Sequence, residues 1–207
     1  MIRDYKIYYN DSVLLIKSDH SQSNENFAKV LTEEAEVQNF INNPQELFDP
    51  QATGNILLIV PTPEKALETI LSSADKIMAG GGIVFNETDD ILLIFRRGKW
   101  DLPKGKIEKG EKVIDGARRE VEEETGVKVK MVVESPIVTH HAYVLKGKKA
   151  IKETEWFIMK AQPGQTNLKP QAEEDIEQVL WVKKADLHNY KAGSYHLVWD
   201  LLSVYAH

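Results

Sequence analysis

Short apolar runs of strand length alternate with amphipathic segments of helical spacing along this chain of 207 residues. In the second part of the chain the apolar runs lie at 82–85, 91–95, 154–161 and 178–182, with further alternation near 128–145. Two segments with helical spacing, 111–124 and 194–205, interrupt or follow them. Strands that interleave with helices predict an α/β fold, with a mixed sheet covered by helices on both faces.

A run of three glycines, Gly80 to Gly82, divides the chain into parts of different charge. Residues 1–78 carry 6 basic and 12 acidic side chains, whereas residues 79–207 carry 20 of each. The whole net charge of −6 therefore belongs to the first part. Because glycine permits any backbone angle, we place a domain boundary here, between a small extension (1–78) and a main domain (79–207).

The first part is predicted to be a small N-terminal α/β unit. Its expected elements are a hairpin of residues 5–9 and 12–16, a helix over 25–41, a buried strand at 56–60, and a helix that begins at Pro63 after a Thr62 cap. Nothing in this part has catalytic spacing. We expect a docking or dimerisation module there rather than a second active site, so a homodimer is one of the expected assemblies.

Composition excludes several classes of function. The chain has no cysteine, which rules out a disulfide framework, a thiolate zinc site and a cysteine nucleophile. The negative net charge argues against a generally basic nucleic-acid binder. No apolar run approaches the ~20 residues that cross a bilayer, and the first residues lack the apolar stretch of a secretory signal. We expect a cytoplasmic globular protein with neither nucleic acid nor membrane as a partner.

The segment 111–124 is the best-defined predicted helix. Val113, Ala117 and Val121 stand four residues apart and form a narrow apolar stripe. Gly126 suits the left-handed residue that ends a helix.

Three carboxylates, Glu120, Glu123 and Glu124, lie away from this stripe and share one side of the helix. Adjacent carboxylates repel one another unless a cation neutralises them, and Mg²⁺ binds such oxygen ligands together with waters and substrate phosphates. The alternative is a solvated helix face on which Arg119 pairs with Glu123 four residues on. The surrounding sequence favours the metal site.

That surrounding sequence resembles the complete Nudix box. Gly105 is followed after five residues by Glu111 and then, after seven more, by residues 119–127, which read Arg-Glu-Val-Glu-Glu-Glu-Thr-Gly-Val. The resemblance covers residues 79–207. It implies a Nudix α/β/α sandwich with a mixed sheet, and hydrolysis of a nucleoside diphosphate linked to another group with Mg²⁺ or Mn²⁺ as cofactor.

The resemblance also implies roles for individual residues. The metal ligands would be Glu120, Glu123, Glu124 and the backbone carbonyl of Gly105, and the supporting ion pair would join Arg119 to Glu111. We assign Glu124 or Glu123 as the general base without choosing between them. In related enzymes a further carboxylate lies outside the box, for which Glu177 is the first choice and Glu174 the second; the alternative for both is a solvated acidic loop.

Three features narrow the expected small-molecule nucleotide substrate. Tyr143 lies sixteen residues after Val127, as in dinucleoside polyphosphate hydrolases, where ADP-ribose pyrophosphatases tend to have proline. The segments 139–143 and 152–157 resemble the His-x-Tyr and Lys-x-Thr-x-Trp-Phe segments of diadenosine tetraphosphate and diphosphoinositol polyphosphate hydrolases. The third feature is charge, because the basic residues that lead into the box could steer a polyphosphate into the acidic cleft. The expected substrate-binding residues are Lys104, which lies beside Gly105 and would contact phosphate, and His141, Tyr143 and Lys152.

The predicted reaction is cleavage of a dinucleoside polyphosphate such as diadenosine tetraphosphate to ATP and AMP. The rival reaction is removal of pyrophosphate from oxidised or ordinary nucleoside triphosphates, with nucleotide-sugar cleavage third. A different class of function is a nucleotide-sensing Nudix domain without catalysis. Because every box glutamate is present, the enzyme is favoured over the sensor.

Overall fold

The computed structural model describes residues 4–19, 26–133 and 135–206. The described chain forms two compact units. The first comprises the chain up to Ile77 together with Thr139–Glu153, and the second comprises Met78–Val138 and the chain from Thr154 onward. Strands β5 (Asp75–Phe85) and β11 (Lys148–Ala161) contribute residues to both units. Among the described helices, none has the length and apolar character that a bilayer span requires.

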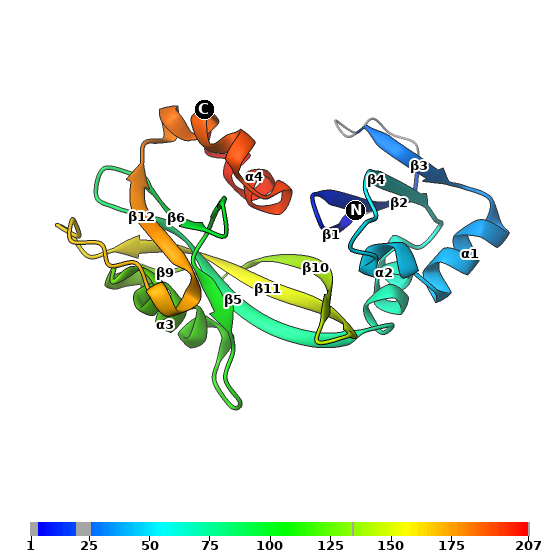
Figure 1. Cartoon of the computed structure of the whole chain (residues 1–207), viewed down its shortest axis with the longest axis horizontal. Helices are drawn as coiled ribbons and strands as arrows, with labels where there is room; N and C mark the ends of the chain where they lie inside the picture. The colour runs from blue at the N-terminus through cyan, green and yellow to red at the C-terminus, as the bar shows by residue number, and fades with distance from the viewer. Residues whose placement is uncertain (1–3, 20–25, 134, 207) are drawn as a thin grey trace. The chain divides into compact units, whose positions relative to one another are not determined.

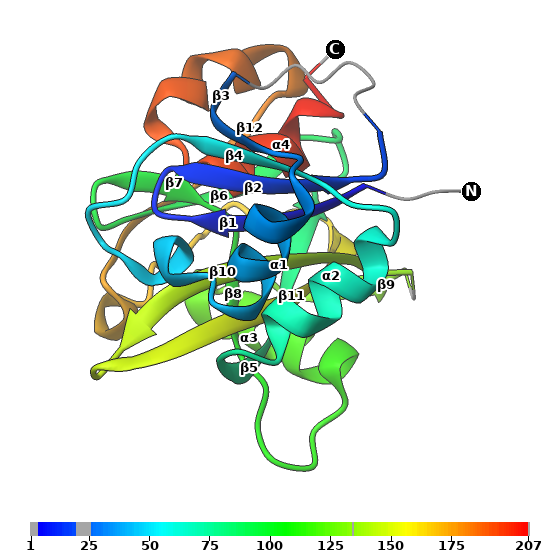
Figure 2. The same cartoon turned by 90° about the vertical axis from the view of Figure 1, so that its right-hand side faces the viewer.

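The first unit is a sheet with two helices packed on it (Figure 2). Its strands follow the order β10 (Ile137–Leu145), β1 (Tyr5–Tyr9), β2 (Ser12–Lys17), β4 (Asn55–Ile59) and β3 (Phe27–Leu31). Strands β1 and β2 form the predicted hairpin, whereas β10 with β1, β2 with β4 and β3 with β4 pair in parallel. The helices α1 (Glu34–Asn42) and α2 (Pro63–Leu71) and the 3₁₀ turn η1 (Gln45–Phe48) bury apolar side chains against this sheet.

Two details of the first unit differ from the sequence prediction. The predicted helix over 25–41 is wrong in its first half: residues 27–31 form β3, and helix begins only at Glu34. The chain there pairs with β4, so tertiary hydrogen bonding overrides helical spacing. Residue 25 lies outside the described residues. Thr62 does precede α2, but its side chain makes no capping hydrogen bond.

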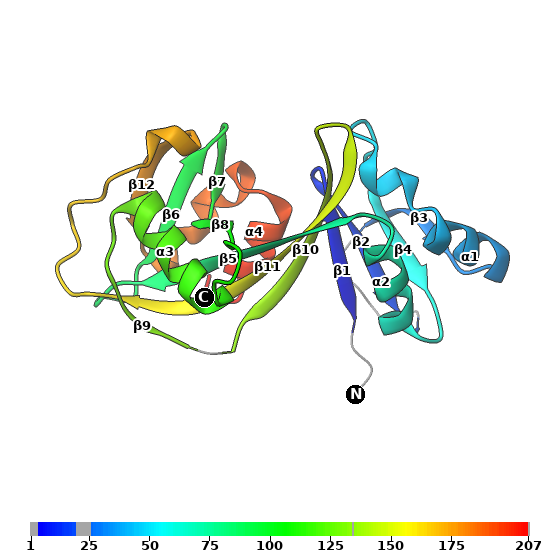
Figure 3. The same cartoon turned by 90° about the horizontal axis from the view of Figure 1, so that it is seen from below.

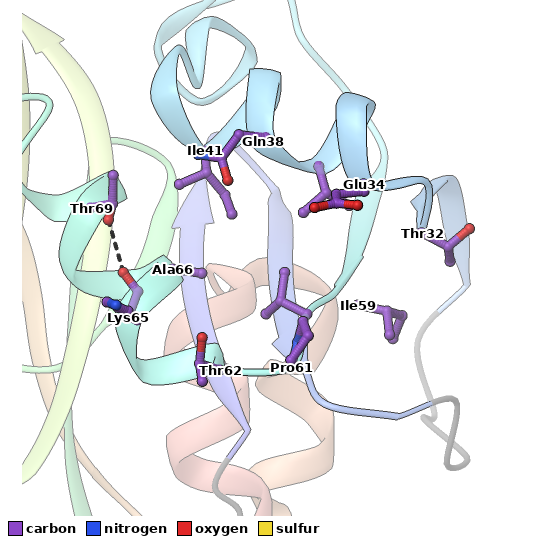
Figure 4. Close-up of a pocket in the computed structure, with 12 residues that line it drawn as sticks. Thr32, Glu34, Gln38, Ile41, Ile59, Pro61, Thr62, Lys65, Ala66 and Thr69 are labelled. Carbon is purple, nitrogen blue, oxygen red and sulfur yellow. Dashed lines mark hydrogen bonds between the residues drawn. The ribbon is translucent and has the colours of Figure 1, made fainter.

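A cavity of about 630 Å³ lies between α1 and α2, next to the end of β4 (Figure 4). Its floor includes the buried side chains of Val37, Val60 and Ala66. The charged side chains at its rim, Glu34 and Lys65, are exposed to solvent. Among the described residues, no buried side-chain nitrogen or oxygen lacks a hydrogen-bond partner, so no unpaired polar group marks this cavity as a binding site.

The second unit is a sheet with helices on both faces (Figures 1 and 3). Its main strands follow the order β12 (Ile176–Val182), β6 (Ile91–Arg96), β5 and β11, and the short strands β7 (Lys99–Asp101), β8 (Lys104–Lys106) and β9 (Val129–Val132) pair with β6, β5 and β11. On one face α3 (Val113–Thr125) packs on Val84 and Leu92. On the other face, Ile83 and Leu93 pack with the 3₁₀ segment η3 (Lys184–Gly193) and α4 (His196–Ser203).

This arrangement confirms the predicted Nudix-type α/β/α sandwich. The sheet of the described chain is mixed, since β12–β6 and β5–β6 pair antiparallel and β2–β4, in the first unit, pairs in parallel. The expectation for the glycine run was different. Gly80, Gly81 and Gly82 lie inside β5 rather than in a flexible connection. A Cβ at Gly80 would come within 2.9 Å of Ala117 in α3, and one at Gly82 within 2.8 Å of Val121. These glycines are therefore explained by the close approach of α3 to the strand.

The crowding around Gly81 gives a stability prediction. Its Cβ would lie 2.6 Å from the Lys104 Cβ and 2.8 Å from the Pro103 carbonyl oxygen, neither of which is the end of a flexible side chain. We expect Gly81→Ala to lower the free energy of unfolding by about 1–3 kcal/mol in urea titration. In the control Gly193→Ala, the new Cβ meets the Trp100 ring at 3.1 Å, and a smaller loss is expected. Equal losses in the two variants would contradict this account of the strand.

Candidate active site

The acidic helix α3 is held by its apolar stripe and by a glycine stop. Ala117 and Val121 are fully buried against the sheet. Gly126 adopts the left-handed conformation (φ 74°), and its N–H donates to the Glu122 carbonyl oxygen at 2.9 Å. With one side of the helix fixed against the sheet, the neighbouring glutamates face the segment that includes β8.

Glu120 lies directly over Gly105. A Cβ at position 105 would stand 1.9 Å from Oε2 of Glu120, so no residue with a side chain fits there while the carboxylate keeps this position. Strand β8 pairs with β5, which places Gly105 opposite Gly80. Burial raises the pKa of Glu120, and the charges of Glu123 and Glu174 act in the same direction while Arg119 opposes the rise.

Glu124 is the most deeply buried carboxylate of the box, with 1% of its surface exposed. Its Oε2 accepts a hydrogen bond from the backbone N–H of Lys104 at 2.8 Å, and its Oε1 accepts one from Nη1 of Arg96 at 3.3 Å. Burial raises the pKa of Glu124 to about 7, against the opposing charges of Lys104 and Arg96. A buried carboxylate of this kind can accept a proton near neutral pH.

Arg119 connects the carboxylates to the loop before the helix. Its Nε and Nη2 donate to the two oxygens of Glu111 at 2.9 and 3.0 Å. Its Nη1 donates to Glu120 at 2.8 Å and to Glu123 at 2.9 Å. The structure thus contains both the Arg119–Glu111 pair and the pairing of Arg119 with Glu123 four residues on. The hydrogen bonds from Arg119 lower the pKa of Glu111 to about 2, with the Glu108 N–H as a further donor.

Lys104 is placed beside the carboxylates, and its ammonium group is already engaged. Nζ forms an ion pair of 2.6 Å with Asp101, whose other oxygen accepts the Leu102 N–H. Asp101 is buried. The pair holds the lysine next to Gly105, and a phosphate contact from Lys104 would have to be shared with Asp101.

The two carboxylates considered outside the box lie in different places. Glu174 ends the 3₁₀ turn η2 (Ala172–Glu174), and its charge is felt at Glu120. The N–H of Gln171, just before this turn, donates to the Glu124 carbonyl oxygen at 3.2 Å. Glu177 lies on β12 and is exposed. Of the two candidates, Glu174 is therefore the one whose charge acts on a carboxylate of the box.

The predicted substrate-binding residues of the β10–β11 hairpin come together in the first unit. The rings of His141 and Tyr143 have centroids 5.6 Å apart, and Nζ of Lys152 lies 5.8 Å from the Tyr143 ring centroid. Burial raises the pKa of Tyr143. These three residues belong to Thr139–Glu153, which clusters with the first unit, whereas the box glutamates belong to the second.

Sequence reasoning counted Arg96 only among the basic residues that could steer substrate toward the box, and it did not assign Asp101 and Gly116 to the site. A Cβ at Gly116 would meet Oε2 of Glu111 at 2.7 Å, so this glycine makes room for the Arg119–Glu111 pair. Its position inside a helix, where glycine costs about 1 kcal/mol, was the available signal. Arg96 gave no local signal, because its partner Glu124 lies 28 residues away, whereas Asp101 lies only three residues before its partner Lys104.

The side chains suit a hard divalent cation chemically, although in their present orientation they do not enclose one. No three acidic or histidine side chains of the described residues form a metal-binding group, and Arg119 donates to both Glu120 and Glu123. The fit rests on the donor set. Glu120 lies against Gly105, Glu124 accepts the N–H of the adjacent Lys104, and Glu123 is carried by the same helix. Carboxylate oxygens are ligands that Mg²⁺ prefers.

Comparison with known proteins shows the family. The NUDIX domain model matches residues 76–200, which is more than half of the chain, and the chain belongs to this family.

Individual relatives match parts of the chain. Nudix hydrolase 6 of Arabidopsis thaliana is 29% identical over 139 residues, covering 59% of this chain and 48% of that protein. RNA pyrophosphohydrolase of Pelagibacter ubique (strain HTCC1062) is 32% identical over 94 residues, covering 39% of this chain and 60% of that protein. The chain thus spans about half of the plant relative. A solved NUDIX hydrolase from Nitrosomonas europaea aligns with 63% of this chain and 88% of its own at 21% identity and a TM-score of 0.47.

The Arg119–Glu111 pair gives a pH prediction. Because the pKa of Glu111 is lowered to about 2 in the folded chain, the folded state binds fewer protons than the unfolded state, whose glutamates titrate near pH 4.3. The pair's stabilisation is complete above that value and is lost as pH falls toward 2. We expect urea titrations to show a constant deficit for Glu111→Gln above about pH 5.5, shrinking below pH 4. A deficit that stays the same at pH 3 would contradict the pairing.

Proposed function

We propose that this chain is a Nudix pyrophosphohydrolase that cleaves a dinucleoside polyphosphate such as diadenosine tetraphosphate with Mg²⁺ or Mn²⁺. The observation that carries the proposal is the contact of Glu120 with Gly105 and of Glu124 with the neighbouring Lys104 N–H, on a helix that also carries Glu123, in a chain that belongs to the NUDIX family. Water would attack an internal phosphorus, and the bridging P–O bond would break to release ATP and AMP.

The ligands proposed for the divalent ion are Glu120, Glu123, Glu124 and the carbonyl of Gly105. When bound, the ion supplies positive charge for the phosphate oxygens and increases the acidity of a water molecule. Glu124 is preferred over Glu123 as the proton acceptor, because two donors fix its carboxylate and burial raises its pKa to about 7. Arg119 holds Glu123 and orients the helix against the preceding loop.

The dinucleotide substrate is supported by the hairpin cluster. His141 and Tyr143 offer adjacent aromatic surfaces on which a nucleobase can stack, and Lys152 adds a cation over the tyrosine ring. Lys104, beside Gly105, would contact a phosphate close to the carboxylates.

A second candidate is hydrolysis at the triphosphate end of an RNA or a nucleoside triphosphate. The name of the Pelagibacter ubique relative, RNA pyrophosphohydrolase, favours this alternative. Hydrolysis of RNA would require nucleic acid as a partner, which the net charge of −6 argues against. The oxidised nucleoside triphosphates form a third group of substrates for the same site.

A panel of substrates separates these reactions. The chain is incubated with Mg²⁺ and diadenosine tetraphosphate, 8-oxo-dGTP, ADP-ribose or a 5′-triphosphorylated RNA, and the products are resolved by chromatography. We expect the dinucleotide to be consumed fastest, with ATP and AMP as products in equal amounts. Faster consumption of 8-oxo-dGTP or RNA would reject the dinucleotide assignment, and no turnover of any compound would reject the enzyme.

The catalytic role of Glu124 has a matched control in the same helix. Removal of a general base typically costs 10²–10⁴-fold in rate, so Glu124→Gln should lower kcat by that order with the fold retained. Glu122 points elsewhere, pairing with Lys128 at 2.7 Å and accepting the Val129 N–H at 3.0 Å. We expect Glu122→Gln to keep near-normal kcat. Turnover by Glu124→Gln similar to that of Glu122→Gln would remove Glu124 from the catalytic residues.

A further inference from the structure

Two consecutive arginines, Arg96 and Arg97, lie at the end of β6 and form ion pairs with different partners. Arg96 is the last residue of the strand, and Arg97 and Gly98 form a two-residue turn with positive φ at both positions (52° and 77°) before β7. Along the strand Arg96 shares a face with Leu92, which packs in the cluster beneath α3. The direction of Arg96 toward α3 is therefore set by the strand.

Arg96 and Arg97 differ strongly in environment. The side chain of Arg96 is 14% exposed and that of its partner Glu124 only 2%. The side chains of Arg97 and its partner Asp175 are 64% and 62% exposed, although their ion pair is shorter at 3.0 Å. An exposed ion pair of this kind contributes little to stability, about 0–1 kcal/mol. When the partner of a buried carboxylate is removed, water does not take its place, so the carboxylate is left without a compensating charge.

The Glu124 carboxylate is held on both of its oxygens. The Lys104 N–H at Oε2 comes from the segment that carries Gly105, and the Arg96 guanidinium at Oε1 comes from the end of β6. Two donors on separate oxygens fix the plane of the carboxylate group. Each oxygen keeps a second lone pair, which is free of these two donors and can bind a ligand or accept a proton.

We propose that Arg96, outside the Nudix box, is a positioning residue that fixes Glu124 for its work in the reaction. The inference rests on the proposed function, because Glu124 is taken there as ligand and proton acceptor. Arg96 acts through Glu124 and needs no contact with substrate. Outer partners of metal-binding side chains typically matter by 10–100-fold in metal affinity or activity.

The test compares the two neighbouring arginines in the full-length chain. Mn²⁺ affinity is measured by electron paramagnetic resonance without nucleotide, and kcat and KM are measured with the best substrate of the panel. We expect Arg96→Gln to lose about 10–100-fold in both Mn²⁺ affinity and kcat with little change in KM. Arg97→Gln should remain close to the wild type in all three. Arg96→Lys should recover part of the loss, since an ammonium group retains the charge but not the planar donor geometry.

A double-mutant cycle guards against a purely structural effect. If Arg96 acts through Glu124, Arg96→Gln should reduce Mn²⁺ affinity no further in a Glu124→Gln background. Equal reductions in both backgrounds, or an Arg96→Gln variant that matches Arg97→Gln, would overturn the inference. Because Mn²⁺ binding is measured without nucleotide, this result stands apart from the substrate panel. A chain whose Mn²⁺ affinity depends on Glu124 and on Arg96 acting through it, but which cleaves no nucleotide, would reject the proposed function alone.

Discussion

The repulsion among carboxylates on one side of α3 is the constraint on which the rest of the site depends. Glu120, Glu123 and Glu124 follow one another within a little over one helical turn, and their negative charges need compensation. Arg119 compensates two of them from the same helix, and Arg96 with the Lys104 N–H compensates the third from the sheet. Each compensating group leaves lone pairs on the carboxylate oxygens. The acidic cluster can therefore exist in a folded chain and still have lone pairs for a cation.

The fold supplies the close approach that this chemistry requires. Glycines in β5 let α3 lie close to the strand, Gly105 lets Glu120 reach the backbone of β8, and Gly116 makes room for Glu111. A methyl group at any of these positions would move the helix or the loop against the sheet. Packing and function are therefore coupled in the second unit, where a change made to the core is felt at the carboxylates.

The parts that could be predicted from sequence are those determined by local spacing. The apolar stripe of α3, its glycine stop and the β1–β2 hairpin depend on residues a few positions apart, and the structure agrees with them. The local spacing of residues 27–31 predicts a helix, but these residues pair with β4, whose residues lie about 28 positions further along the chain. A pairing over that distance leaves no local pattern. The pairing of Arg96 with Glu124 could not be predicted for the same reason, since the two residues are 28 positions apart in the sequence, and the sequence suggests only a steering role for Arg96. The glycine run of β5 predicts a flexible connection when read by itself, because the α3 side chains that crowd it are identified only in the folded structure.

The central claim is that the α3 carboxylates bind a divalent ion. Crystals soaked in Mn²⁺ and measured at a wavelength where manganese scatters anomalously test it most directly. The account predicts an anomalous peak among the oxygens of Glu120, Glu123 and Glu124 near the Gly105 carbonyl, with the Arg119 guanidinium turned away from at least one of these carboxylates. A soaked crystal with no peak at this position, or with manganese only elsewhere on the chain, would contradict the account.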